Sequence, residues 1–152
     1  MYKNKNFDEL ELKGKDFEKE VFVSSKFVGC NLRFTSFKNC EFKLCDFSGC
    51  IFDMTSFRDC KFPESKLSNL NFSESTFKDC DFSFAVMENC IFEQFRDSNK
   101  LIRRNFDLSG SIFKHTTLSR SIFNFCDFSK VKFTESNLEG VVFEKCNLLE
   151  TN

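Results

Sequence analysis

The segments SFKNCEF (residues 36–42), SFRDCKF (56–62) and TFKDCDF (76–82) are nearly the same seven residues, repeated at a spacing of twenty. A repeat at a fixed period is typical of a solenoid, in which each unit buries its apolar side only against neighbouring units. The repeat therefore decides the fold.

Within each segment phenylalanine recurs after five residues, and this step of five extends far beyond the three segments. From Phe7 every fifth residue up to Phe92 is Phe, Leu or Met; the spacing resumes one residue out of phase at Leu108 and continues to Leu148. We call these the central positions, and they hold nineteen of the 24 phenylalanines. All nine cysteines lie two residues before a central position, which we call the corner position.

A period of five fits neither an α-helix, which repeats every 3.6 residues, nor a flat strand, which repeats every two. It fits a chain that makes a quarter turn per five residues, with the central side chain and the small corner side chain pointing inward. Four such units close a square coil of twenty residues. The sequence therefore predicts an all-β, four-cornered β-helix of about seven coils, with one loop interruption and with Phe42, Phe62 and Phe82 stacked along its axis.

The units also resemble the pentapeptide repeat family, whose unit is a small residue, Asn or Asp, Leu or Phe, then Ser, Thr or Arg, then any residue. Typical units are CNLRF (30–34), CDFSG (45–49), LNFSE (70–74), CDFSF (80–84), CDFSK (126–130), SNLEG (136–140) and CNLLE (146–150). The resemblance covers about residues 7–92 and 106–150. It implies that the quadrilateral β-helix is right-handed.

For function, the resemblance implies a non-catalytic protein-interaction module or scaffold whose biochemical role is open. The alternative is a mimic of B-form DNA that binds DNA gyrase or topoisomerase IV and protects cells from quinolones, as some members of the family do. The chain departs from those members in its near-neutral charge, with 22 basic and 23 acidic residues, and in the lack of an evident C-terminal helix.

Composition and charge narrow the class of protein further. The chain of 152 residues is long enough for a single domain, which we divide into an N-terminal tail (1–6), a first repeat block (7–92), an interrupting loop (93–107) and a second block (108–150). No apolar run suggests a membrane span, and the charged N-terminus does not read as a secretory signal. We therefore expect a cytoplasmic protein that binds neither membrane nor nucleic acid directly.

No residue pattern indicates catalysis, a cofactor, a metal or a small-molecule substrate. The cysteines lack the spacing of zinc ligands, and their shared register favours reduced, buried side chains at the corners. Cys40, Cys60 and Cys80 are expected to stack, with parallel Cβ directions that disfavour a disulfide. The single histidine, His115, falls at an outward position. We expect a protein that is not an enzyme.

Two features are individual enough to be candidate binding sites. The interruption at 93–107 carries four basic and three acidic residues, and long loops in regular scaffolds often carry recognition. Its candidate partner-binding residues are Phe95, Arg96, Lys100, Arg103 and Arg104. The alternative interpretation, a tolerated insertion, is equally open.

The second feature is the C-terminal end, where the last coil would leave apolar residues uncovered. We predict an end-to-end homodimer through Val141, Phe143, Leu148 and Leu149. Outward residues suggest further surfaces: Lys38, Arg58 and Lys78 should form a column beside Asn39, Asp59 and Asp79, so that charges compensate laterally. Phe34 above Met54, and Ile51 in one column with Ile91, form a candidate apolar patch.

Overall fold

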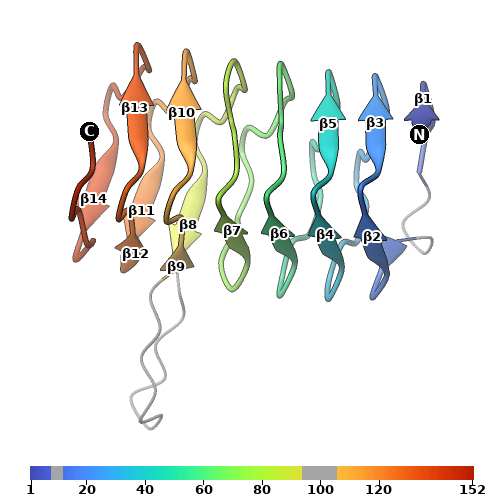
Figure 1. The fold of residues 1–152 in the computed structure, drawn as a ribbon, viewed down its shortest axis with the longest axis horizontal. Helices are drawn as coiled ribbons and strands as arrows, with labels where there is room; N and C mark the ends of the chain where they lie inside the picture. The colour runs from blue at the N-terminus through green and yellow to red at the C-terminus, as the bar shows by residue number, and fades with distance from the viewer. Residues whose placement is uncertain (8–11, 94–105) are drawn as a thin grey trace, which may run out of the picture.

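The computed structural model of the chain describes residues 1–7, 12–93 and 106–152. Short parallel strands lie side by side along a rod, with the N-terminus at one end and the C-terminus at the other (Figure 1). The predicted all-β solenoid of stacked coils is confirmed. Among the described residues, no helix is long and apolar enough to cross a membrane.

The coils have four sides, which we name after four successive central residues: the Phe42, Phe47, Phe52 and Phe57 faces. Strands pair only between coils, never within one. The Phe42 face holds β1 (Tyr2–Lys3), β3 (Val21–Val23), β5 (Glu41–Lys43), β10 (Ile112–Lys114) and β13 (Lys132–Thr134). The Phe52 face holds β8 (Ile91–Glu93), β11 (Ile122–Asn124) and β14 (Val142–Glu144).

The Phe57 face is built from β2 (Asp16–Glu18), β4 (Ser36–Lys38), β6 (Ser56–Arg58), β7 (Thr76–Lys78), β9 (Phe106–Asp107) and β12 (Cys126–Asp127). The Phe47 face is joined by isolated parallel bridges such as Lys26 to Asp46 and Val86 to Thr117. All four sides therefore use the same inter-coil pairing, which satisfies backbone donors and acceptors without any long strand.

Register shows where the interruption lies. Phe37 is paired with Phe57, one turn of twenty residues later, whereas Phe92 is paired with Phe123. The second separation is 31 residues, so eleven residues have been added to one turn. In the sequence they lie between Phe92 of the Phe52 face and Leu108 of the Phe57 face. Every column continues in register after Leu108, as the out-of-phase resumption of the repeat predicts.

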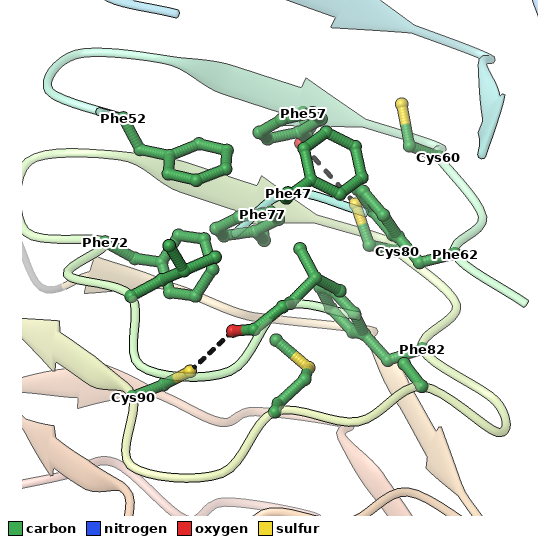
Figure 2. Close-up of a cluster of buried hydrophobic side chains, with 14 of the residues drawn as sticks. Phe47, Phe52, Phe57, Cys60, Phe62, Phe72, Phe77, Cys80, Phe82 and Cys90 are labelled. Atoms are coloured by element: carbon green, nitrogen blue, oxygen red, sulfur yellow. Dashed lines mark hydrogen bonds between the residues drawn. The ribbon is translucent and has the colours of Figure 1, made fainter. Parts of the chain in front are cut away.

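Stacked aromatic rings fill the interior. On the Phe42 face an uninterrupted column of rings runs from Tyr2 to Phe133, with successive centroids 4.9–5.2 Å apart. Phe42, Phe62 and Phe82 are completely buried in it. Rings on adjacent faces meet edge to face, as Phe57 and Phe62 do at 5.3 Å (Figure 2). The predicted tiers are therefore confirmed, and offset and edge contacts both favour them.

The corners combine a strained backbone with a small inward side chain. Wherever the second residue after a central position is described, it has a positive φ, between 48° and 71°. The corner side chain then donates a hydrogen bond to a carbonyl in the preceding coil: Ser65 Oγ lies 2.6 Å from Phe42 O, and Cys80 Sγ 3.6 Å from Phe57 O (Figure 2). Ser, Thr and Cys suit this position because they are small and carry a donor.

The solenoid begins before Phe7, where the first repeat block was expected to start. Tyr2 lies in β1, paired with β3, and its ring stacks on Phe22 at 4.9 Å. One further step of five back from Phe7 reaches Tyr2, so the signal was present within the expected tail. From Tyr2 to Phe133 the column holds seven rings separated by six turns, in agreement with the expected coils of about seven.

Candidate functional site

The candidate loop residues Phe95, Arg96, Lys100, Arg103 and Arg104 lie outside the described part of the chain. The described ends of the expected 93–107 loop belong to the wall of the solenoid. Glu93 is the last residue of β8, and Phe106–Asp107 form β9, which pairs with β12.

Phe106 is the one described aromatic residue at a corner position, and the coils before and after it place the small Ser75 and Cys126 in the same column. It is completely buried, edge-on to Phe92 at 5.7 Å and tilted against Phe77 at 6.3 Å. Leu108, the following central residue, is smaller than the Phe77 and Phe128 that precede and follow it in its column. Compared with the coils on either side, the coil that receives the insertion therefore has a larger side chain at the corner position and a smaller one at the central position.

The C-terminal coil presents apolar side chains at the end of the rod. Phe143, Leu148 and Leu149 are 39%, 52% and 65% exposed, and Val141 is partly buried. In the middle of the rod the same central positions are completely buried, as Phe123 and Phe128 are. The structure therefore brings the four predicted interface residues together in one exposed coil.

All nine thiols are free, as expected, and eight are buried. Burial is the main influence that raises the pKa of Cys45 to about 11 and that of Cys90 to about 12. Cys146 differs because it is only partly buried in the last coil, and a hydrogen bond from Cys126 lowers its pKa to about 7. The reactive form of a cysteine is the thiolate, so Cys146 combines accessibility with a high thiolate fraction.

We expect iodoacetamide to modify Cys146 first. Its labelling rate should reach half its maximum near pH 7 and fall about tenfold per pH unit below that, following the thiolate fraction. Buried thiols such as Cys45 should react only as the protein unfolds. Mass spectrometry of timed samples measures both rates, with Cys146→Ser as the control. Equally fast labelling of Cys45 would contradict the expectation.

Bulky apolar side chains are exposed at several of the positive-φ positions, which lie two residues after a central position. Phe34 (φ 60°) and Met54 (φ 56°) are 56% and 58% exposed and follow one another in a single column. The expected alignment of Phe34 with Met54 is therefore observed. Ile51 and Ile91 share a column but are separated by Asn71. Sequence inspection missed the continuation of that column in Ile122 and Val142, because the eleven added residues hide their register.

His115 points outward, as expected, and it too has a positive φ, two residues after the central Phe113. Its ring stacks on Phe84 with centroids 4.9 Å apart, and its Nδ1 is 3.0 Å from the Glu135 carboxylate. These are surface contacts between successive coils. Within the described ranges there is no group of three or more His, Cys, Asp or Glu side chains arranged to hold a metal ion.

The Phe57 face carries a groove between two rows of outward side chains. Lys38, Arg58 and Lys78 line one side, and Ser36, Ser56, Thr76 and Asp107 line the other, above Phe37 and Phe57. The predicted column of cations is present and in register. The expected lateral compensation is not made by ion pairs: for Arg58 and Lys78 the described residues provide no salt bridge, and Lys38 reaches only Glu18, at 3.7 Å.

Comparison with known proteins places this geometry in a family. A model of pentapeptide repeats matches eight copies, over residues 25–62, 55–94, 104–134 and 126–152. No curated protein matches the chain in sequence.

Among solved structures, a trypsin-treated variant of QnrB1, a plasmid-mediated fluoroquinolone resistance protein, superposes with a TM-score of 0.85 and 16% identity, over 99% of this chain and 70% of QnrB1. Full-length QnrB1 gives a TM-score of 0.57 at 17% identity, over 92% of this chain and 89% of QnrB1. At such identities the likeness concerns the fold alone. The repeat match, the square coils and the corner hydrogen bonds agree, and the chain belongs to the pentapeptide repeat family.

Proposed function

We propose that this chain is a non-catalytic protein-interaction module that works in the cytoplasm. The observation that carries the proposal is the pair Phe34 and Met54 at the corner between the Phe52 and Phe57 faces. A left-handed conformation costs an ordinary residue about 1–2 kcal/mol, and more than half of each side chain is exposed, so neither residue stabilises the fold much. Apolar side chains that are exposed at positions costly to stability indicate a surface that contacts a partner.

The supporting experiment is affinity capture from the native cytosol, followed by mass spectrometry. We expect the double variant Phe34→Asn/Met54→Asn to lose partners that the native protein retains, because asparagine tolerates positive φ but removes the apolar contact. Glu64→Asn is the matched control, because Glu64 is also exposed, lies two residues after a central position and has a φ of 58°. Equal capture by all three proteins, or capture of nothing, would overturn the proposal.

A further variant tests the candidate loop. Replacing residues 93–107 by a regular repeat removes Phe95, Arg96, Lys100, Arg103 and Arg104 together. Loss of the captured partner from this variant alone would assign specificity to the loop. Retention would make the segment a tolerated insertion.

The second candidate function is the binding of DNA gyrase or topoisomerase IV as a DNA mimic, with protection from quinolones. The superposition on QnrB1 over nearly the whole chain favours it. The row Lys38, Arg58 and Lys78 and the near-zero net charge argue against it, because a mimic of DNA needs unpaired acidic columns. A gyrase supercoiling assay with ciprofloxacin tests this candidate. If micromolar protein neither inhibits gyrase nor protects it from the drug, the candidate is removed.

We also propose that the chain forms a homodimer, two copies stacking through the exposed C-terminal coil. Dimerisation would cover Phe143, Leu148 and Leu149 and would slow the labelling of Cys146 as protein concentration rises. Light scattering at micromolar concentration should give twice the monomer mass, and Leu148→Asp should restore the monomer, because burying a carboxylate in an apolar contact is unfavourable. A native protein that remains monomeric contradicts the proposal.

A further inference from the structure

Two charged rows on other faces of the solenoid differ from the row on the Phe57 face. In those two rows, charges stacked in register alternate in sign: Lys26, Asp46 and Lys66 on the Phe47 face, and Glu41, Lys61 and Asp81 on the Phe42 face. Hydrogen bonds from Ser48, together with Lys66 and Lys26, hold the pKa of Asp46 below its usual value although burial acts to raise it. Alternation favours stacking, since like charges directly opposite in a sheet are destabilising.

On the Phe57 face the pairing partners are Lys38, Arg58 and Lys78, three cations in succession. Among the described residues, Arg58 and Lys78 have no carboxylate in ion-pair distance. Asp59 and Asp79 follow them at the corners, but Asp79 extends over Gly110, where its Oδ1 occupies the space that a glycine Cβ would need. Arg58 and Lys78 therefore form no ion pair with the described residues, and together with Lys38 they line a groove.

The rest of the groove supplies hydrogen-bond donors and an apolar edge. Ser36, Ser56 and Thr76 form its opposite side, and Asp107 continues this row beyond Thr76 as the one acidic residue in the lining. Phe34 and Met54 lie two residues before Ser36 and Ser56, so they border the hydroxyl row along the same corner. Across the face a ligand would meet, in order, apolar, hydroxyl and cationic side chains.

The backbone of the face is already paired between coils, so a ligand can be recognised only by side chains. The coils repeat at about 4.8 Å, close to the roughly 5.4 Å rise per turn of an α-helix and well below the roughly 6.7 Å between same-side residues of an extended strand. Acidic residues on successive helical turns would therefore stay opposite Lys38, Arg58 and Lys78. A face five residues wide, about 15 Å, also accommodates one helix of 10–12 Å diameter.

We propose that the groove of the Phe57 face binds an acidic amphipathic helix of a partner protein, lying parallel to the rod axis. Its carboxylates pair with Arg58 and Lys78, and its apolar stripe packs on Phe34 and Met54. This inference deepens the proposed interaction function and rests on it.

The test uses a synthetic helical peptide as the probe, with glutamate at i, i+4, i+7 and i+11 and leucine one residue after each. A peptide of the same composition, with both stripes scrambled, is the control probe. Fluorescence anisotropy at low and moderate salt measures affinity for the intact protein. We expect the patterned peptide to bind at least tenfold more tightly than the scrambled one, and NMR shifts to cluster at Ser56, Arg58 and Thr76.

Two charge-matched double variants locate the site. Arg58→Gln/Lys78→Gln should weaken binding of the patterned peptide at least tenfold, whereas Lys43→Gln/Lys114→Gln, which removes two exposed lysines from the Phe42 face, should change it less than twofold. The groove variant should unfold at the same or a slightly higher temperature, because it relieves like-charge stacking.

Each adverse outcome has a defined meaning. Equal binding of the two peptides, equal loss in the two double variants, or no binding of the patterned peptide overturns the helix proposal. If the Arg58→Gln/Lys78→Gln protein still retains a partner captured by the native protein, the groove is not its site, while the interaction function stands. If the native protein captures nothing, the interaction function fails on its own experiment.

Discussion

Replacing Phe62 with alanine is expected to lower the free energy of unfolding by about 3–5 kcal/mol. Phe62 is completely buried in the middle of the uninterrupted ring column, 5.1 Å from Phe42 and 5.0 Å from Phe82. Its removal leaves a cavity and breaks two stacking contacts at once. A loss of this size is a large part of the 5–15 kcal/mol typical of folded domains. In thermal denaturation the midpoint should fall by about 10 °C.

Two further variants keep this prediction open to contradiction if Phe62→Ala fails to fold. Phe62→Leu should cost about 1.5 kcal/mol, less than Phe62→Ala because Leu67 already occupies an equivalent central position on the neighbouring face. Phe34→Ala, at an exposed corner, should stay within about 0.5 kcal/mol of the native protein. Similar losses for Phe34→Ala and Phe62→Leu would mean that the column does not carry the stability.

The second large effect concerns the coil that receives the insertion. Phe106→Cys should lower the free energy of unfolding by about 3 kcal/mol, because it empties the corner that the ring fills between Phe92 and Phe77. Leu108→Phe alone should cost about 1 kcal/mol by overpacking the same space. Together they convert FDL into CDF, the sequence found one coil later at 126–128. The double variant should be more stable than Phe106→Cys alone.

A double-mutant cycle measured by chemical denaturation tests this compensation directly. We expect a favourable interaction between the two substitutions of about 2 kcal/mol, within the range for residues in contact. Purely additive losses would show that Phe106 and Leu108 do not share one volume. Cys126→Ser, a conservative change at the regular corner next to Phe106, serves as the control for changing corner chemistry without changing size.

Much of the fold could be predicted from the sequence because its period is short and nearly unbroken. A step of five assigns each residue to the inside, a corner or the outside, and twenty residues per turn then places Phe37 under Phe57 and Cys60 under Cys80. The same arithmetic predicts the cation column and the exposed C-terminal coil. It needs no side-chain conformation, since backbone pairing between coils enforces the register.

What depends on side-chain placement could be known only from the tertiary structure. The pattern could not show that Arg58 and Lys78 form no ion pair with the described residues, because Asp79 adjoins Lys78 in sequence and only the tertiary structure directs its carboxylate over Gly110. Nor could it show that Phe106 fills a corner, since a broken period leaves inside and outside undefined. The sequence by itself determined the square coil and its columns, through periodic burial; the tertiary structure decided the groove and the altered coil, through packing and charge geometry in three dimensions.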